Sequence, residues 1–599
     1  MAISQNSTGG PSHHVGIDLG TTNCAVFYLP TDSAGPVRAL EIPQVVRPGE
    51  VAGRPLLPSF TYLAGEGEFP AGALELPWAA GRDFSVGEFA RQQGGLVPTR
   101  LVSSAKSWLS HAAVDRRAAI LPWRSPEESR RISPVEASAR YLGHLAEAWS
   151  HAHPGQPLGG QDIVLTVPAS FDPEARELTL DAARQAGLGQ VILLEEPLAA
   201  FYSWLESQGD NWRRLVRVGD LILVCDVGGG TTDFTLISVT EDMGNLQLCR
   251  LAVGNHILLG GDNMDLALAH AANQGLAAKG SRLDHSQFLQ LVHAARSAKE
   301  SMLSQADIAS AKFHVQGRGT KLVAGGISGE IPRSLLDSIL LDGFFPACGA
   351  GDEPRRQSSA GLQEAGLPYA TDAAITRHLA AFLAQHRGGK RVSAVLFNGG
   401  VFKSRLLRER ILATLAGWFS GDPVRCLESA DLEVAVAHGA ACYARARKQG
   451  GIRVRGGTAR SFYVGVEIPA PAVPGFAPPI KALCVVPFGM EEGSESPVPN
   501  LELGLVVGEP VQFRFLGSNR RKDDSIGTAV EDWQEDIEEL TPLSATLDSD
   551  AAPGTRVPVR LHSRVTEVGT LELSCQGVHD NRRWKLEFKV RENDQSTAQ

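Results

Sequence analysis

The chain has 599 residues, of which 43% are hydrophobic and 21% charged, and its formal net charge is −10. That length exceeds what one hydrophobic core usually serves, so two or more domains are expected. The acidic net charge is not that of a typical nucleic-acid-binding protein. No stretch approaches the roughly 20 apolar residues that a membrane helix needs, so neither nucleic acid nor membrane is an expected partner.

The amino-terminal residues 1–13 are polar and contain Gly and Ser, without a basic region or an apolar signal core. We expect a disordered lead-in and a cytoplasmic protein. The eight cysteines include no Cys-x-x-Cys pair, and several lie inside apolar runs. They are therefore expected to be reduced and structural, without a cysteine metal site.

One pattern occurs twice in the chain, as Ile17-Asp18-Leu19-Gly20-Thr21-Thr22 and as Cys225-Asp226-Val227-Gly228-Gly229-Gly230-Thr231-Thr232-Asp233. In each copy an apolar run leads into an aspartate, then glycine and threonine, then further apolar residues, which predicts strand, tight turn and strand. A single copy is typical of an ordinary hairpin turn. The second copy with the same polarity favours a shared chemical role.

These residue types suit a phosphate site. Glycine lets backbone N–H groups approach a phosphate, threonine hydroxyls add donors, and an aspartate at the strand end can hold magnesium through its waters. Neither a P-loop nor the glycine fingerprint of a dinucleotide fold occurs in the sequence. Two facing hairpins that clamp one triphosphate are therefore the expected nucleotide site.

Further segments follow in a fixed order along the chain. They are Ser104 to Leu109, Asp162 to Phe171 with Arg176, Leu194 to Ala200, Leu259 to Asp262, Phe397 to Gly400, and Ala435 to Ala441. Together with the two hairpins they resemble the ATPase domain of the heat-shock protein 70 (DnaK-type) chaperones, within the actin and sugar-kinase superfamily. The resemblance covers residues 14–447.

The resemblance implies an α/β fold of two actin-like lobes, each with a mixed sheet flanked by helices, and a nucleotide at the floor of the cleft between them. It implies ATP or ADP as ligand, Mg²⁺ as cofactor, and slow hydrolysis of ATP to ADP and phosphate. Unfolded or extended polypeptide, a J-domain co-chaperone and a nucleotide exchange factor are the partners that it implies.

The family roles carry over residue by residue. Asp18 and Asp226 match the aspartates that hold Mg²⁺ through water, and Lys106 and Glu196 match the catalytic lysine and the glutamate that orients the attacking water. The catalytic set is Lys106, Glu196, Asp226 and Thr231; the nucleotide-binding set is Gly20, Thr21, Thr22, Gly228, Gly229, Gly230, Thr231, Gly260, Gly261, Lys299, Gly399 and Gly400.

Local sequence leaves other readings open. Lys106 before Ser, Trp and Leu is also typical of a helix-surface lysine, and Glu195-Glu196-Pro197 is a helix-start pattern. Pro168 and Arg176 match residues that relay nucleotide state in the family, but also fit a strand end and a surface arginine.

The adenosine end of the expected site departs from the family. The helix that carries Lys299 has one residue more than the usual spacing. Val401-Phe402-Lys403 stands where small polar residues and an arginine are common.

The expected domains are the ATPase domain at 14–447, a linker at 448–460 and a β-rich domain at 461–599. The linker is basic and flanked by glycine, unlike the acidic, leucine-rich linker of the family, and only Ile452 and Val454 could dock into a groove. An inserted surface loop is expected at residues 344–369.

Apolar residues alternate with others from Phe462 onward, which predicts half-buried strands and a sandwich-like β domain. Its alternation is carried by Val511, Phe513 and Phe515, by Leu571, Leu573 and Cys575, and by Trp584, Leu586, Phe588 and Val590. The domain is a candidate for peptide binding, or alternatively it only stabilises the ATPase. Nine residues follow Val590, which predicts a lidless member of the family.

The sequence thus predicts an ATPase that controls binding of unfolded or extended peptide. The alternative is a nucleotide-gated interaction protein that holds one dedicated partner with little turnover. A small-molecule kinase of the same superfamily fits less well, because the strand-rich carboxyl-terminal domain has no evident place in such an enzyme.

Overall fold

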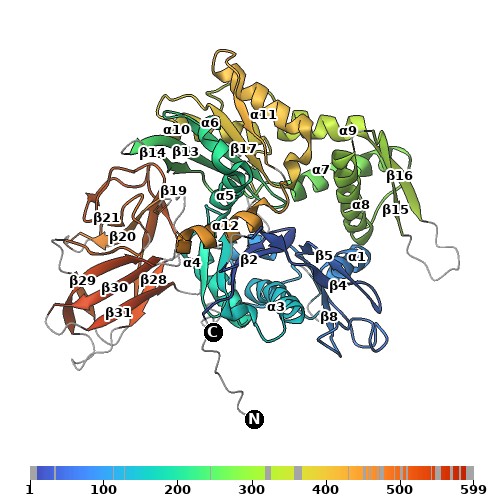
Figure 1. Ribbon diagram of the computed structural model, residues 1–599, viewed down its shortest axis with the longest axis horizontal. Helices are drawn as coiled ribbons and strands as arrows, with labels where there is room; N and C mark the ends of the chain where they lie inside the picture. The colour runs from blue at the N-terminus through green and yellow to red at the C-terminus, as the bar shows by residue number, and fades with distance from the viewer. Residues whose placement is uncertain are drawn as a thin grey trace, which may run out of the picture.

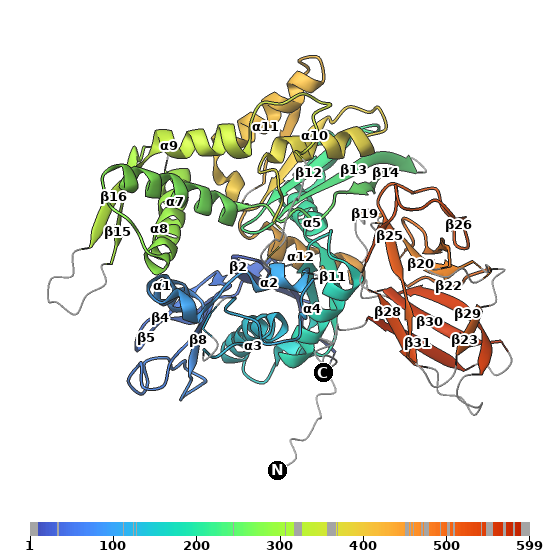
Figure 2. The ribbon, with the colours of Figure 1, turned by 180° about the vertical axis from the view of Figure 1, so that it is seen from behind.

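The computed structural model describes residues 10–588 with internal gaps, so most of the predicted lead-in lies outside it (Figures 1 and 2). Within that range it leaves out residues 33–34, 112, 124, 127–128, 243–244, 306, 317–325, 356–366, 368, 430, 450–453, 456, 459, 469–470, 472–477, 492, 500–502, 507–509, 541, 547–554, 567–570 and 579–581.

The first lobe is built on a mixed sheet whose strands lie in the order β11-β10-β1-β2-β3, with β6 also paired to β2. The first Asp-Gly-Thr motif forms the turn between antiparallel β1 and β2, and β1 also pairs in parallel with β10. The strands are β1 (His13–Leu19), β2 (Asn23–Pro30), β3 (Arg38–Ala39), β6 (Leu57–Pro58), β10 (Asp162–Val167) and β11 (Val191–Glu195).

The second lobe repeats this arrangement in the order β18-β17-β12-β13-β14-β19. The second motif forms the turn between antiparallel β12 and β13, and β12 pairs in parallel with β17. The strands are β12 (Leu221–Val227), β13 (Thr232–Asp242), β14 (Asn245–Val253), β17 (Ala394–Asn398), β18 (Arg425–Leu427) and β19 (Val454–Arg455). The predicted two-lobed fold with duplicated mixed sheets is confirmed.

Helices cover both sheets and join them. Every residue of β12 is buried, which is typical of a strand covered on both faces. Between the two sheets, α5 and α12 pack against one another, and their apolar residues share one core with both sheets. The main helices of the two lobes are α2 (Ala105–Leu109), α3 (Pro134–Ala152), α4 (Pro173–Gln185), α5 (Glu196–Gln208), α6 (Trp212–Leu215), α10 (Ile375–His386), α11 (Arg405–Trp418) and α12 (Ala435–Gln449).

Each lobe carries a smaller outer part, and these two parts meet at α1 and α8 (Figure 1). Across this contact Arg91 of α1 lies 3.8 Å from the Glu300 carboxylate of α8. The outer elements are β4 (Ile42–Arg47), β5 (Glu50–Arg54), β7 (Thr61–Leu63), β8 (Phe84–Val86), β9 (Leu101–Val102), α1 (Glu88–Leu96), α7 (Gly261–Ala278), α8 (His285–Ser304), β15 (Ser310–Val315), β16 (Ile327–Pro332) and α9 (Arg333–Ser338).

The carboxyl-terminal region forms two sheets whose described strand pairs are antiparallel, in the orders β26-β21-β20-β25-β27 and β22-β29-β30-β31-β28-β24, with β23 paired to β29. Residues from both sheets form one core, as in a β-sandwich. The strands are β20 (Ser461–Glu467), β21 (Ile480–Val486), β22 (Glu495–Pro497), β23 (Leu503–Val506), β24 (Pro510–Phe513), β25 (Phe515–Ser518), β26 (Ala529–Val530), β27 (Glu538–Glu539), β28 (Leu543–Thr546), β29 (Arg556–Val565), β30 (Leu571–Gly577) and β31 (Arg583–Phe588).

The predicted alternation of apolar residues corresponds to side chains that point into the core of the sandwich. Leu573 and Cys575 of β30, and Trp584 and Leu586 of β31, are buried in the shared core. The alternating run from Val511 to Phe515 divides between β24 and β25, which lie in different sheets. Val590 lies outside the described residues.

The segment before the sandwich adds a short strand to the second lobe. Val454 of β19 pairs in parallel with Leu248 of β14, and its backbone N–H donates to the Tyr202 hydroxyl at 3.0 Å. Val454 also packs against the core around α5 and α12. Ile452, the other residue expected to dock, lies outside the described residues.

The start of the expected 344–369 insertion is held to α11. The Trp418 indole N–H donates to the Cys348 carbonyl at 2.7 Å, and Arg410 donates to the Phe345 carbonyl at 3.1 Å. Most of its second half, 356–366 and 368, lies outside the described residues.

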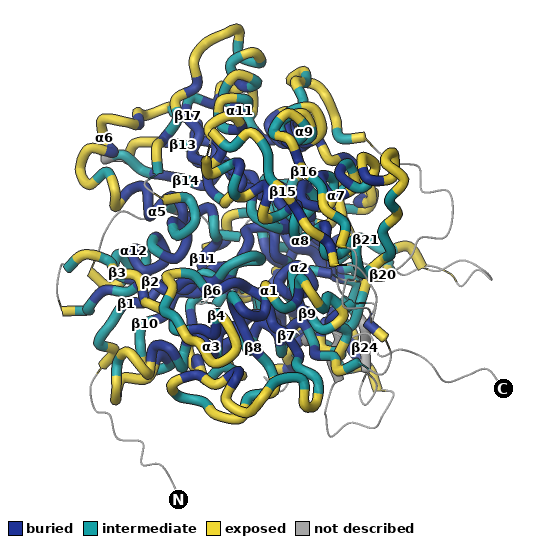
Figure 3. Tube along the Cα trace, turned by 90° about the vertical axis from the view of Figure 1, so that its right-hand side faces the viewer, coloured by how far each residue is buried: buried dark blue, intermediate teal, exposed yellow. Residues whose placement is uncertain are grey.

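Burial follows this layered plan. Figure 3 shows the buried segments inside the sheets, whereas exposed stretches follow the loops and the outer helices. Among the described residues, no helix has both the length and the apolar character needed to cross a bilayer.

Candidate nucleotide-binding site

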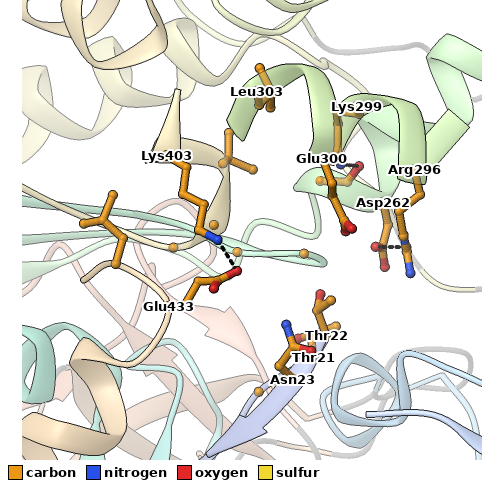
Figure 4. Close-up of a pocket in the computed structure, with 18 of the residues that line it drawn as sticks. Thr21, Thr22, Asn23, Asp262, Arg296, Lys299, Glu300, Leu303, Lys403 and Glu433 are labelled. Carbon is orange, nitrogen blue, oxygen red and sulfur yellow. Dashed lines mark hydrogen bonds and ion pairs between the residues drawn. The ribbon is translucent and has the colours of Figure 1, made fainter. Parts of the chain in front are cut away.

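A cavity of about 620 Å³ lies between the lobes, with residues of both hairpins in its wall. That volume is within the usual range of small-molecule sites. Figure 4 shows Thr21 and Thr22 of the first hairpin facing the residues of α8 across it. Among its lining residues are these predicted ones: Asp18, Gly20, Thr21, Thr22, Lys106, Glu196, Asp226, Gly228, Gly229, Thr231, Gly261, Lys299, Gly399 and Gly400.

The other two predicted residues, Gly230 and Gly260, lie just behind this wall and pack against the hairpins. A Cβ on Gly260 would lie 2.7 Å from the Gly228 and Gly229 carbonyl oxygens, and one on Gly230 would lie 2.9 Å from the Ser107 hydroxyl. The structure thus brings the whole predicted set together, with these two residues supporting the turn.

Glycine is required where the two motifs approach one another. A Cβ on Gly229 would lie 1.8 Å from Oγ1 of Thr22, so the second hairpin could not come this close to the first with a larger residue. Gly399 has φ +89°, and a Cβ there would lie 2.2 Å from the Val227 carbonyl oxygen. At both positions the cavity wall is therefore formed by backbone atoms and not by a side chain.

Lys106 lies on α2 but is only 6% exposed, so the alternative of a helix-surface lysine is wrong. Its ammonium forms an ion pair with Glu196, the first residue of α5. Burial favours a lower pKa for Lys106, but the neighbouring carboxylates of Glu196 and Asp18 raise its pKa above the ordinary value. Lys106 therefore keeps a fixed positive charge inside the cavity.

The backbone in front of Lys106 is strained. Ser104, the residue before α2, has φ 54° and ψ 27°, a left-handed conformation that is uncommon for residues other than glycine. Its hydroxyl donates to Asp262 of the second lobe at 3.2 Å. This contact links the start of the lysine-bearing helix to the opposite lobe.

The carboxylates around Lys106 carry more negative charge than one lysine offsets. Asp18 accepts a hydrogen bond from Thr166 at 3.0 Å, and Asp226 accepts one from Nδ2 of Asn398 at 2.7 Å. Burial raises the pKa of Asp18 to about 6 and, with the nearby charge of Glu196, raises the pKa of Asp226 to about 8.

This donor set fits a hard divalent cation. Carboxylate oxygens are ligands that Mg²⁺ accepts, directly or through water, and a nearby cation would stabilise the ionised form of these carboxylates, whose pKa is raised mainly by burial. Oδ1 of Asn398 is also buried and finds no hydrogen-bond partner among the described residues. The residues present therefore suit Mg²⁺ beside a triphosphate.

A network of ion pairs lies on the α8 side of the cavity (Figure 4). Lys299 belongs to the predicted set, whereas Arg296 does not. Lys299 pairs with Asp265 at 2.7 Å and donates to the Gly261 carbonyl at 2.7 Å. Arg296 pairs with Asp265 at 2.8 Å and also with Asp262. Arg296 precedes Lys299 by three residues and therefore shares its helix face, a spacing that could have revealed it.

The far end of the cavity holds the ion pair between Lys403 and Glu433, whose Nζ and Oε1 are 2.5 Å apart. Leu303, Val401 and Val436 add apolar surface there. The sequence marks Lys403 as a departure from the family pattern, whereas nothing local to Glu433 marks it as the partner of Lys403, because the two residues are distant in the chain. Charged and apolar surface therefore meet at this end of the cavity.

A chain of charged groups leads from the cavity to the linker. Glu195, next to Glu196, pairs with Arg176 at 2.9 Å and with Arg250 of β14. Arg250 also donates to the Gly457 carbonyl, in the segment between β19 and β20, the first strand of the sandwich. Arg176 is thus engaged in an ion pair and is not a free surface arginine.

Comparison with known proteins gives one family model and a set of bacterial chaperones. Residues 83–340 match the model described as Hsp70 protein. The chain is 31% identical to the chaperone protein HscA of Serratia proteamaculans over 356 residues, which are 57% of this chain and 49% of that protein.

It is also 33% identical to the chaperone protein HscA homolog of Bordetella pertussis over 328 residues, covering 51% of this chain and 45% of that protein. The chain spans about half the length of the curated relatives that it matches.

Proposed function

We propose, since this chain is a divergent member of the Hsp70 family, that it is an ATP-dependent chaperone whose hydrolysis of ATP controls the binding of unfolded or extended polypeptide. The observation that carries the proposal is the buried Lys106–Glu196 ion pair in a cavity that both glycine-threonine hairpins also line. The similarity to proteins named chaperone protein HscA supports the same class of activity.

In the proposed reaction a water molecule attacks the γ-phosphate of ATP and displaces ADP. Glu196 orients this water, and Lys106 offsets the negative charge that develops on the phosphoryl oxygens. The hairpin N–H groups and the Thr21, Thr22 and Thr231 hydroxyls hold the phosphates. Asp18 and Asp226 would hold Mg²⁺, which supplies charge neutralisation between the phosphates when bound.

The β-sandwich is the proposed polypeptide-binding part, and the linker is its connection to the cavity. Support comes from Arg250, which contacts both Glu195 beside the catalytic glutamate and the Gly457 carbonyl beside the sandwich. A movement at Glu195 can therefore reach the linker through one side chain. We further propose a J-domain co-chaperone and a nucleotide exchange factor as partners, and a cytoplasmic location.

The proposal is tested by phosphate release from labelled ATP with the purified chain. Repeated turnover in Mg²⁺, with more than one phosphate per protein, is expected. Tight ATP binding without turnover contradicts the ATPase and supports the alternative, a nucleotide-gated protein that holds a dedicated partner.

The Asp18→Asn variant is expected to bind ATP about 10- to 100-fold more weakly in Mg²⁺, because one carboxylate of the metal shell is lost. Binding in EDTA should change little. Calorimetric titration in both conditions measures the difference, with Asp422→Asn, an exposed aspartate paired with Arg391, as the control. Equal loss in Mg²⁺ and EDTA would show that Asp18 does not act through a metal.

A further inference from the structure

A hydrogen-bonded cluster joins the two lobes beside the cavity. From the first lobe, the Ser110 hydroxyl lies 3.0 Å from Nε2 of His256 and the Ser170 hydroxyl lies 2.6 Å from its Nδ1. His256 belongs to the second lobe, between β14 and α7. Ser170 also donates to Oδ1 of Asp233 in β13 at 2.5 Å. One imidazole therefore bridges two first-lobe serines, and one of these holds a second-lobe aspartate.

The donors fit a neutral imidazole. Ser170 has a single hydroxyl hydrogen and gives it to Asp233, so its contact with His256 requires Nδ1–H as the donor. Burial lowers the pKa of His256 to about 4, which keeps the ring neutral near pH 7. Nε2 is then an acceptor facing the Ser110 hydroxyl, whose single hydrogen is shared between Nε2 at 3.0 Å and the Ser107 carbonyl at 2.9 Å. The Phe171 ring packs edge-on against the imidazole, with centroids 5.8 Å apart.

His256 is held rigidly by the strand that carries Asp233. The Thr232 N–H donates to the Ile257 carbonyl at 2.9 Å, and the Gly254 N–H donates to the Phe234 carbonyl at 2.8 Å. Residues on both sides of His256 are thus fixed to the residues on both sides of Asp233. The imidazole and this carboxylate therefore move together as one part of the second lobe.

The first-lobe partners of His256 lie next to catalytic elements. Ser110 directly follows α2, the helix of Lys106. Ser170 follows β10, whose Thr166 donates to Asp18. Asp233 itself is 4% exposed and lies within electrostatic reach of Lys106 and Glu196. The contacts of His256 consequently depend on the same spacing of the lobes that assembles the catalytic groups.

We propose that His256 is a positioning residue, which latches the two lobes in their closed arrangement and, through Ser170, fixes Asp233 beside Lys106 and Glu196. The inference deepens the proposed ATPase and rests on it. Opening of the lobes breaks both serine contacts of His256 and releases Asp233, whereas closure restores them together.

Two substitutions of His256 distinguish the contribution of Nδ1 from that of Nε2. His256→Asn places an amide near Nδ1 and can keep the Ser170 contact, whereas His256→Gln places one near Nε2 and can keep only the Ser110 contact. We expect His256→Gln and Ser170→Ala to lower the single-turnover rate of ATP hydrolysis about 10- to 100-fold, with ATP affinity nearly unchanged. His256→Asn should recover most of the rate. His285→Leu, at an exposed helix start, is the control.

Equal rates in wild type, His256→Gln and Ser170→Ala would overturn the proposal. Equal losses in the Asn and Gln variants, at equal melting temperatures, would also overturn it, because a merely structural histidine does not distinguish the two nitrogens.

A second measurement does not require hydrolysis. Dissociation of a fluorescent ADP analogue should be severalfold faster in His256→Leu than in wild type, since the lobes open more readily without both contacts. If wild type binds but does not hydrolyse ATP, the proposed ATPase fails, and this dissociation rate alone decides the latch. An unchanged rate contradicts the latch.

Discussion

Replacement of Lys106 by alanine is expected to lower single-turnover hydrolysis of ATP by about 10²- to 10³-fold, the usual cost of losing one preorganised charge or donor at a transition state. Lys106 is buried, paired with Glu196, and held positive by the carboxylates beside it. Its charge is therefore available when charge develops on the transferred phosphoryl group. Rapid mixing of the protein with stoichiometric labelled ATP measures the rate.

ATP affinity should change much less in this variant, because the hairpins and not the lysine make most of the expected phosphate contacts. Lys403→Ala is the matched control, since Lys403 lines the same cavity at its other end and pairs with Glu433. That control should affect nucleotide affinity and leave the hydrolytic step near wild type. A Lys106→Ala protein that hydrolyses ATP at the wild-type single-turnover rate removes Lys106 from the mechanism.

The Arg250→Ala variant is expected to lose about 2–3 kcal/mol of unfolding free energy, below the usual cost of breaking a buried ion pair because Arg176 remains, and to release the linker from the ATPase region. The Arg250 side chain is 2% exposed and pairs with the buried carboxylate of Glu195. Removal of one partner of a buried ion pair leaves the other charge uncompensated, although Arg176 still offsets part of it. The lost contact with the Gly457 carbonyl removes the tie to the sandwich.

Two measurements check this expectation. Urea unfolding gives the free energy, and hydrogen exchange at the Val454 amide, which donates to Tyr202, reports docking of the linker. Exchange there should become at least about tenfold faster. Glu195→Gln combined with Arg250→Ala should recover part of the stability but not the docking. Arg425→Ala, which removes a more exposed arginine, is the control. Unchanged exchange at Val454 would contradict the proposed linkage.

The duplicated hairpins could be predicted from sequence because their determinants are local. Glycine, threonine and aspartate at fixed offsets between apolar runs encode each turn, and the structure places Asp18 and Asp226 at matching strand ends. The helix-start reading of Glu196 is also confirmed, since α5 begins at this residue. Here the structural and the proposed catalytic roles coincide in one residue.

Contacts between distant segments could not be predicted from local patterns. The partner of Lys403 is Glu433, and the partners of His256 lie on the other lobe. None of these pairs has a sequence spacing that a helix or a hairpin would impose. The residues around Arg250 predict only a strand. Its contact with Glu195 results from the packing of the two lobes, which no local pattern encodes.

The central claim is that ATP bound between the lobes controls polypeptide binding by the sandwich. The most direct test is the dissociation rate of a labelled unfolded peptide from the full chain, with and without Mg·ATP. Faster release in Mg·ATP than in Mg·ADP or without nucleotide is the predicted result. Measurable ATP binding together with no peptide binding, or with a release rate that nucleotide does not change, would contradict the claim.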